Sequence, residues 1–497
     1  MRLGIDFGTT RTVVAVARDG RHPLVAFDLG DESHDFVPGT AAMVQGELVV
    51  GWPAARAVAA GTATHAIRSI KRAAASLPPD AAVPGLPGIS ALDLVTAFLG
   101  ELRNLILDAS NAEASGPLEA MVSVPANASS RQRWLTMEAF RRAGFQPIGL
   151  VNEPTAAAIE LAHRHLAELG PKSKKRYVVV YDLGGGTFDA SAVSLEGRRF
   201  DLIATEGLSR LGGDDFDDII LAAAQEQLGL PRVADAAALE RAREAKEGLR
   251  STSKKLLVDL GAAGAAQLDL ADIYARCQSL VDRTIAQTDL LFERLRAHGI
   301  DPDDNRELGG VYLVGGAAAF PAVSRALRQR FGKKLQLAPQ PFASTAIGLA
   351  LAADPGANVL VREAVTRHFG VWREGDAGAD RVFDPLIGKG AAIDPGGTVE
   401  RRYRARHTVG HLRFVECGDL DAAGQPVQDL VPWADILFPY EGDVADPELE
   451  AVPIERRDQP LDEIAETYTV QPDGSIVVTI ANVARGYART YDLGALR

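Results

Sequence analysis

A turn made only of glycine, between two apolar runs, constrains the fold of this chain more than any other stretch. Tyr177–Val180 is a largely β-branched run typical of a buried strand, and Ala190–Val193 is expected to form the strand that returns from it. Gly184, Gly185 and Gly186 stand between them. A turn without side chains lets backbone N–H groups converge at close range, which suits phosphate oxygens. The pattern predicts a β-hairpin with a phosphate-binding turn, although a merely flexible turn would have the same composition.

Two aspartates flank this turn and point to a metal beside the phosphate. Asp182 precedes the glycines and Asp189 follows them, with Thr187 between. A carboxylate next to a phosphate group is best explained by a cation between the two, and Mg²⁺ prefers oxygen ligands. The stretch 181–189 therefore predicts a site for a phosphate ester with Mg²⁺.

The N-terminus repeats the same design. Leu3–Phe7 is expected to form a short strand that contains Asp6, followed by the turn Gly8-Thr9-Thr10 and a second strand at Thr12–Ala17. Two such turns that face each other would hold a triphosphate from both sides, with Asp6 and Asp182 across the metal. The repeat predicts a cleft between two related lobes.

A third glycine turn, Gly315-Gly316, follows the apolar run Val311–Val314 and precedes a predicted helix at 320–330. Each lobe is expected to continue with further strands and helices, and repetition on this scale indicates two lobes of common ancestry. The predicted strands are 120–124, 148–151 and 335–337, and the predicted helices are 91–109, 129–143, a helix from 154, 217–228, 235–255, 269–298 and 343–352.

Six motifs occur in an order that resembles one known family. They are Gly4–Thr10, Val124–Ala126, Asn152–Ala158, Asp182–Asp189, Leu211–Asp217 and Leu313–Gly316. Together they are similar to the ATPase domain of the DnaK-type heat shock protein 70 family, a branch of the actin and sugar-kinase superfamily. The resemblance implies an α/β actin-like (ribonuclease H-like) two-lobed ATPase domain at 1–356, an interdomain linker at 357–368 and an all-β sandwich domain at 369–497.

The resemblance also implies roles for individual residues. Lys71 is expected to reach the γ-phosphate of ATP and the attacking water, and Glu153, Thr187 and Asp189 to position that water. Without the family context, Lys71 would be read as part of a solvated basic cluster, and Glu153 as a carboxylate that stabilises a helix N-terminus. Mg²⁺ is expected to be held through water by Asp6 and Asp182, and ATP to contact Gly8, Thr9, Thr10, Gly184, Gly185, Gly186, Thr187, Gly212, Gly213, Lys246, Gly315 and Gly316.

Recognition of the adenine base departs from the family pattern. Ala319 stands where the family has a base-stacking arginine, and Phe342 is a candidate to stack on the base instead. Because an arginine stacked on an aromatic ring contributes about 0.5–2 kcal/mol, we expect weaker binding or altered base selectivity. Along one helix the family has Glu, Lys, Arg and Ser, and the corresponding residues here are Arg243, Lys246, Glu247 and Arg250, so that only the lysine is retained.

From about residue 357 the pattern changes to β. The family's linker is a run of leucines ending in an acidic residue, and the segment here is Val359–Glu363. Runs at 381–387, 412–415, 468–470 and 476–480 predict strands, the last two joined by a Pro-Asp-Gly turn, and resemble the family's peptide-binding sandwich. The basic and aromatic run 401–407 is interpreted as a solvated strand, and 419–461 as irregular loops. The helical lid of the family is expected to be absent.

Composition excludes several classes of protein. A formal net charge of −13 argues against a nucleic-acid partner, and no apolar run reaches the about 20 residues that a membrane span needs. The first predicted strand begins at Leu3, which leaves no room for a signal peptide. Cys277 and Cys417 fit no metal or disulfide spacing. We expect a cytoplasmic protein.

Three functions fit these patterns. The preferred one is a chaperone-like ATPase, in which slow Mg-ATP hydrolysis is coupled to binding of extended polypeptide by the β domain. The alternative is a nucleotide-dependent scaffold or regulator that binds one dedicated partner with weak or no ATPase activity, and a more distant one is a sugar kinase or actin-like filament protein. A nucleotide-exchange factor is a further candidate partner. Gly149 replaces the family's arginine that helps to dock J-domain co-chaperones, so a J-domain partner is not implied.

Overall fold

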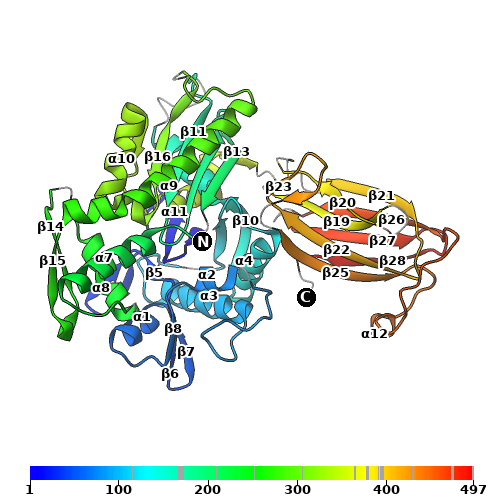
Figure 1. Ribbon diagram of the computed structural model, residues 1–497, viewed down its shortest axis with the longest axis horizontal. Coiled ribbons are helices and arrows are strands. Elements are labelled where there is room, and N and C mark those ends of the chain that lie inside the picture. Colours follow the sequence, from blue (N-terminus) through cyan, green and yellow to red (C-terminus); the bar gives the residue numbers. More distant parts are fainter. Residues whose placement is uncertain are drawn as a thin grey trace. The chain divides into compact units, whose positions relative to one another are not determined.

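A computed structural model gives the fold of the chain (Figure 1). It describes residues 1–497 except 76, 115, 166–172, 209, 234, 251, 305, 363–364, 366, 376–379, 390, 392–396, 428–429, 472–474 and 495–497. The chain divides into two compact units. The first, here called the α/β unit, comprises Met1–Leu77, Ala81–Ala126 and Ala139–Val361, and the second, the β-rich unit, comprises Pro78–Asp80, Asn127–Glu138 and Arg362–Arg497.

Two mixed sheets form the framework of the α/β unit, and they share one strand order. In each, an antiparallel hairpin has two parallel strands on one side and an antiparallel strand on the other. The first sheet runs β10 (Gln146–Asn152), β9 (Glu119–Val124), β1 (Arg2–Phe7), β2 (Arg11–Ala17), β5 (Val37–Pro38). The second runs β17 (Leu335–Leu337), β16 (Leu308–Val314), β11 (Tyr177–Leu183), β12 (Phe188–Ser194), β13 (Arg199–Leu208), β18 (Leu360–Arg362).

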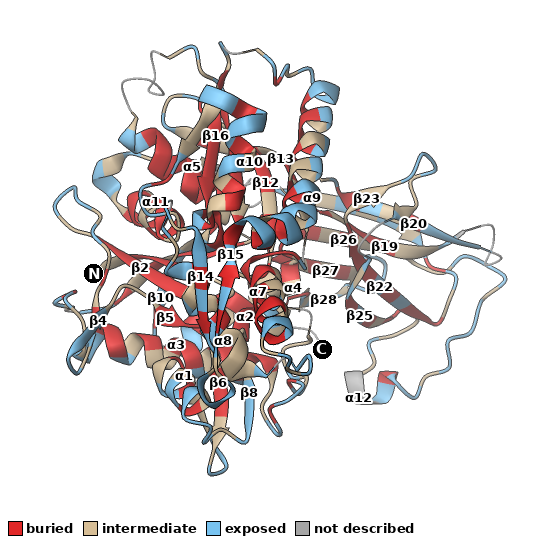
Figure 2. Ribbon diagram, turned by 60° about the vertical axis from the view of Figure 1, so that its left-hand side comes forward, coloured by how far each residue is buried: buried red, intermediate tan, exposed pale blue. Residues whose placement is uncertain are grey.

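The strand β11 confirms the buried strand predicted from its apolar run. Tyr177, Val179 and Tyr181 belong to one core cluster, and Val178 and Val180 belong to another. Successive side chains of a strand point to opposite faces, so both faces of this sheet are covered, as the buried residues of its strands in Figure 2 illustrate. The strand that carries Asp182 is therefore held rigidly at the centre of its sheet.

Helices pack around these two sheets. In α11, Ala346 and Ala350 pack against Val13 and Ala15 of β2. No helix among the described residues has both the length and the apolar character that crossing a membrane requires. The helices are α1 (Trp52–Ala59), α2 (Ile70–Ala75), α3 (Ala91–Asp108), α5 (Glu153–Arg164), α7 (Gly213–Gln227), α8 (Ala236–Glu247), α9 (Leu270–Ala297), α10 (Pro321–Phe331) and α11 (Ser344–Ala353), with 3₁₀ turns at η1 (Gly261–Ala263), η2 (Gly316–Ala319), η3 (Gly332–Lys334) and η4 (Pro355–Ala357). The helix α4 (Ser130–Arg142) is divided between the units, and its residues up to Glu138 belong to the β-rich unit.

The helix predicted at 235–255 is wrong in its second half. The helix α8 ends at Glu247, where Gly248 is the cap, and the strands β14 (Lys255–Asp259) and β15 (Ala265–Asp269) form a hairpin after it. Burial alternates along β14, with Leu256 and Val258 inside, which is the period of a strand. The other small sheets are β3 (Phe27–Leu29) with β4 (Glu32–His34), and β7 (Glu47–Val50), β6 (Ala41–Val44) and β8 (His65–Ile67).

The segment predicted as a linker starts as an edge strand. β18 lies beside β13 in the second sheet. The N–H of Leu360 donates to the carbonyl of Arg198 at 2.9 Å, and the Arg198 guanidinium donates to the carbonyl of Ala357 at 3.0 Å. The Leu360 side chain is largely exposed. Residues 363, 364 and 366 of this segment lie outside the described part of the chain.

Two antiparallel sheets make up most of the β-rich unit. Their apolar side chains meet in one core that includes Phe369, Phe414, Trp433, Tyr468 and Val478. The sheets run β20 (Asp380–Ile387), β19 (His368–Gly375), β22 (Val409–Cys417), β25 (Val431–Pro439), and β21 (Thr398–Arg404), β26 (Glu463–Val470), β27 (Ile476–Asn482), β28 (Tyr487–Asp492). Smaller elements are β23 (Asp419–Leu420), β24 (Pro426–Val427) and α12 (Asp446–Leu449), and the Pro-Asp-Gly turn lies outside the described residues.

One sequence prediction in this unit is wrong, and another is confirmed only in part. The stretch 419–461 contains β25, whose Trp433, Ile436 and Phe438 enter the core, because its prolines lie near the ends of the strand. The run 401–407 contributes to β21, but it is not simply solvated. Arg401 and Tyr403 hydrogen-bond to acidic side chains of other strands.

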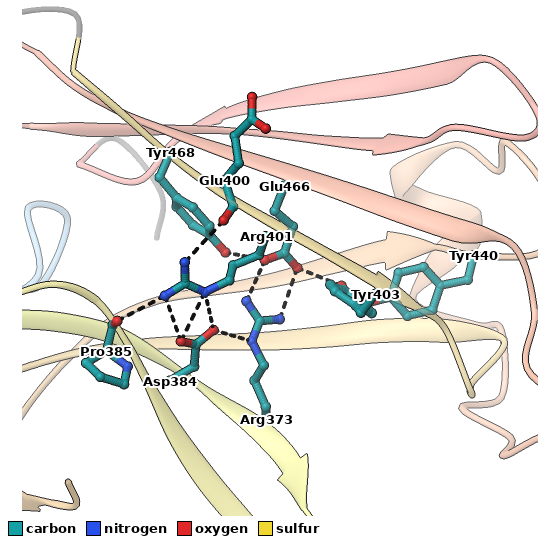
Figure 3. A network of polar contacts seen from close by, with 9 residues as sticks. All are labelled: Arg373, Asp384, Pro385, Glu400, Arg401, Tyr403, Tyr440, Glu466 and Tyr468. Atoms are coloured by element: carbon teal, nitrogen blue, oxygen red, sulfur yellow. Dashed lines mark hydrogen bonds and ion pairs between the residues drawn. The ribbon is translucent and has the colours of Figure 1, made fainter.

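A charged network joins the two sheets of the β-rich unit (Figure 3). Arg373 of β19 donates two hydrogen bonds to the carboxylate of Glu466 of β26, at 2.6 and 3.2 Å. Tyr403 and Tyr468 each donate to the same carboxylate at 2.6 Å. On the other side, Asp384 accepts hydrogen bonds from Arg373 and from Arg401. Glu466 is fully buried, so its charge depends on these donors.

Acid is expected to weaken this network through Asp384. Burial alone would raise the pKa of this carboxyl group, but hydrogen bonds from Arg401 and Arg373 outweigh it and lower the pKa. The ionised group therefore stabilises the folded unit fully above its unfolded pKa of about 3.9, and this contribution is lost as the pH falls through the lower, folded pKa. Unfolding of wild type and Asp384→Asn from about pH 6 to 3 checks this. A stability difference that stays constant over this range would contradict it.

Candidate functional site

The two predicted hairpins place three aspartates at the ends of paired strands. β1 pairs with β2, and β11 pairs with β12, where Asp182 lies opposite Asp189. The predicted residues are distributed as follows: Asp6 in β1; Gly8, Thr9 and Thr10 in the first turn; Lys71 in α2; Glu153 as the first residue of α5; Asp182 in β11; Gly184, Gly185, Gly186 and Thr187 in the second turn; Asp189 in β12; Gly212 and Gly213 at the start of α7; Lys246 in α8; Gly315 after β16; and Gly316 at the start of η2.

The two hairpin turns meet. A Cβ atom on Gly185 would lie 1.7 Å from Oγ1 of Thr10, so no larger residue fits at this position without displacing the first turn. Within the second turn, Gly184 N–H donates to the carbonyl of Thr187 at 3.0 Å. The structure thus brings together the two glycine turns, which lie far apart in the sequence.

The other glycine turns converge on the end of β11. The N–H of Gly213 donates to the carbonyl of Gly184 at 2.9 Å, and the N–H of Asp214 donates to that of Gly185 at 2.7 Å. Gly315 has a positive φ of 90°, and a Cβ atom there would lie 2.4 Å from a carboxylate oxygen of Asp182. All four turns predicted to contact a nucleotide therefore lie around this end of the second sheet.

Acidic side chains surround one lysine at this place. Lys71 Nζ donates to Oε1 of Glu153 at 2.5 Å, and both side chains are mostly buried. Loss of hydration, with repulsion from Glu153, raises the pKa of Asp6 and of Asp189 to about 7. Burial, with repulsion from Glu153, Asp189 and Asp6, also raises the pKa of Asp182 well above its ordinary value, while Lys71 lowers it. Four carboxyl groups thus share one ammonium group.

The excess of carboxyl groups over cationic side chains fits a binding site for a divalent cation. A positive charge between the aspartates would offset the repulsion that raises their pKa values. Within the described ranges, no three acidic, histidine or cysteine side chains lie close enough to one another to ligate a metal directly. Mg²⁺ commonly keeps several water ligands, so Asp6 and Asp182 fit a cation held through water.

Arg243 of the predicted base-binding set lines a cavity beside α8, whereas Lys246 lies at the Gly212-Gly213 turn. Its Nζ donates to the carbonyl of Gly213 at 2.8 Å. Arg250 follows the end of α8 and is not on the helix, contrary to the predicted extent of 235–255. Phe342, the candidate for stacking on the base, packs beside Val13 and Ala15 of β2.

Three residues that sequence reasoning did not single out also contribute to the site. Arg72 donates to the carbonyl of Gly186 at 2.5 Å and lies 3.5 Å from a carboxylate oxygen of Asp214. Ser123 donates to Oδ1 of Asp6 at 2.8 Å. Asp217 forms an ion pair with Lys246 at 2.6 Å. The adjacency of Arg72 to Lys71, and of Asp217 to the Gly-Gly turn, was the only signal available.

Two arginines also form ion pairs with acidic side chains of α8. Arg11 pairs with Glu247 of α8, and Arg68 lies 3.5 Å from Glu240 of the same helix. A cavity of about 540 Å³ opens between α1 and α8 and is lined by residues that include Trp52, Arg68 and Glu240. None of the glycine turns lines it, so this cavity is separate from the place where the acidic residues meet.

One family of proteins matches this chain. The model of the family described as Hsp70 protein matches residues 95–365, which is just over half of the 497 residues. The matched range contains the second hairpin, the Gly212-Gly213 turn and Gly315-Gly316, and it also includes Glu153 and Lys246.

Proposed function

Because the chain belongs to the Hsp70 protein family, we propose that it is an ATP-dependent, chaperone-like protein. Members of this family are nucleotide-binding ATPases that bind polypeptides. Hydrolysis in residues 1–356 would be coupled, through the linker at 357–368, to binding of extended polypeptide by residues 369–497. The common strand order of the two sheets supports two duplicated, actin-like lobes in the first of these regions.

The observation that carries the proposal is the acidic cluster around Lys71 where the glycine turns meet. Phosphoryl transfer to water requires positioning and charge stabilisation more than covalent chemistry. Lys71 is suited to stabilise charge on the γ-phosphoryl oxygens. Glu153, Thr187 and Asp189 are suited to orient the attacking water, and the N–H groups of the turns to hold the phosphates. Mg²⁺, when bound through water to Asp6 and Asp182, would neutralise phosphate charge.

Removal of the metal is expected to abolish hydrolysis. Without a cation, the aspartates repel the phosphates, so we expect turnover to fall by at least about 100-fold when EDTA is added. Single-turnover hydrolysis of radiolabelled ATP by the full chain, with Mg²⁺, with EDTA and with Mg²⁺ restored, checks this. Hydrolysis that continues in EDTA would contradict the assignment of Asp6 and Asp182, and no ATP binding under any condition would overturn the ATPase proposal.

A second candidate is a scaffold or regulator with one dedicated partner and little ATPase activity. It is favoured by Glu247, which occupies a position of the family's base clamp and is paired with Arg11. A single tight partner with no affinity for varied extended peptides would support it. A nucleotide-exchange factor remains a candidate partner in either case.

The two cysteines are free and buried, and we place the protein in the cytoplasm.

A further inference from the structure

A buried ion pair links two helices of the α/β unit next to the Gly212-Gly213 turn. Asp217 of α7 has a fully buried side chain, and that of Lys246 of α8 is 7% exposed. Nζ of Lys246 lies 2.6 Å from Oδ1 of Asp217. Among the described residues, no side chain or backbone group other than Lys246 is bonded to the Asp217 carboxylate. The two charges therefore depend on each other.

The same ammonium group is connected to the phosphate turns. It donates to the carbonyl of Gly213 at 2.8 Å. The N–H of Gly213 in turn donates to the carbonyl of Gly184 at 2.9 Å. A short series of contacts thus runs from Asp217 through Lys246 and Gly213 to the glycine turn of the second hairpin. A change in the position of Lys246 would be transmitted to that turn.

The pair also contributes to the attachment of α8. Of the described residues in this helix, only Ala242 and Lys246 are buried. Because the two are one turn apart, they lie on the same face of the helix. Ala242 provides apolar contact, but a methyl group gives little directional constraint. Ala238, Leu239 and Ala245 of α8 are partly buried and also pack against the core, so the ion pair is a charged contact within an otherwise apolar interface.

Folding stability alone does not explain this pair. Replacing a buried ion pair by well-packed apolar side chains is often neutral or stabilising, whereas removing one partner is strongly destabilising. A structural role for the pair would thus be satisfied by two apolar residues. The position of the pair beside the glycine turns indicates that its charges contribute to ligand binding.

We propose that Asp217 is a positioning residue for nucleotide binding, which holds the Lys246 ammonium group against the Gly213 turn. This inference rests on the proposed function. The ammonium group has three N–H donors. One faces Asp217, one binds the Gly213 carbonyl, and the third is available to bound nucleotide. Without Asp217, the Lys246 ammonium group is expected to turn toward solvent, and α8 to shift relative to the Gly213 turn.

The experiment distinguishes an effect on folding stability from an effect on the position of the Lys246 ammonium group. We expect Asp217→Asn to raise the Kd for Mg-ATP by about 10- to 100-fold, the value of a hydrogen bond to a charged group. The rate of single-turnover hydrolysis at saturating ATP should change less than the Kd. In the double variant Asp217→Leu/Lys246→Met, we expect wild-type stability to thermal unfolding but no recovery of the Kd. Isothermal titration calorimetry and thermal melts of the full chain give both quantities.

The control is an exposed pair of the same residue types in the same unit. Lys255 of β14 and Asp269 of β15 are 3.0 Å apart and about half exposed. The variant Lys255→Met/Asp269→Leu should bind Mg-ATP like wild type. A double variant at 217 and 246 that binds as tightly as wild type would overturn the inference while leaving the ATPase proposal intact. If that variant does not fold, wild-type affinity in Asp217→Asn would overturn it equally. Lack of ATP binding by wild type would overturn both.

Discussion

Hydrolysis of bound ATP is expected to be about 100- to 1,000-fold slower in Lys71→Ala than in wild type, which is the usual cost of removing one preorganised donor to a developing negative charge. Lys71 is the only lysine paired with Glu153 among the described residues. Burial raises the pKa of Asp6, Asp182 and Asp189, and the charge of Lys71 opposes this by lowering all three pKa values. Without it, only Mg²⁺ and the N–H groups of the turns would offset the repulsion between the γ-phosphoryl oxygens and the neighbouring carboxylates.

Single-turnover hydrolysis in Mg²⁺ with excess protein measures this rate independently of product release. ATP affinity, measured in parallel, should change by less than about tenfold, since the glycine turns are unaltered. Lys255→Ala is the matched control, because its lysine is half exposed and pairs only with Asp269 in the described structure. A rate for Lys71→Ala within threefold of the wild-type rate would remove Lys71 from the mechanism.

Removing the charge of Glu466 should cost the β-rich unit about 3–5 kcal/mol of unfolding free energy, as for other buried ion pairs that lose one partner. Its carboxylate accepts hydrogen bonds from Arg373, Tyr403 and Tyr468 (Figure 3). In Glu466→Gln, the amide group cannot accept from all of these donors. Arg373 would then keep Asp384 as its remaining acidic partner in Figure 3.

Hydrogen exchange of β26 and β27 in the full chain reports local unfolding of this unit, and denaturant titration reports its overall stability. The control lies on the same strand. Glu463 pairs with Arg402 at 3.3 Å, and both side chains are largely exposed, so Glu463→Gln should change stability by no more than about 1 kcal/mol. If Glu466→Gln and Glu463→Gln have similar small effects, the buried network contributes no specific stability.

Short-range patterns explain which structural features could be predicted. The hairpin at 177–193 is confirmed because apolar runs and glycine turns determine strands and turns locally. The error at 235–255 has a local cause as well. The stretch is rich in charge and is predicted to be helical as far as Lys255, whereas Gly248 caps the helix and the alternating burial of β14 is the period of a strand. Similarly, proline content concealed β25, since Pro432 and Pro439 lie near its ends.

Long-range pairs account for the features that were missed. Asp217 shares the buried face of α7 with Phe216 and Ile220, a position that helical spacing indicates, but its partner Lys246 is brought beside it only when α8 folds against α7. Arg373 and Glu466 are 93 positions apart, and each alone looks like an ordinary surface charge. The sequence around a charged residue does not indicate which distant residue it pairs with, so such ion pairs can be identified only from the folded structure.

The edge strand β18 is joined to its sheet through the main chain. Its contact with Arg198 uses the N–H of Leu360 and not the side chain, which is largely exposed. Backbone donors and acceptors are the same for every residue except proline, which lacks the donor. Because Val359 and Val361 pack against the apolar core, substitution is expected to be tolerated at Leu360, whose side chain is exposed, more readily than at these two positions. The leucine run of the family and the Val-Leu-Val sequence here are therefore both compatible with the same backbone pairing, and sequence identity will understate the structural similarity of such segments.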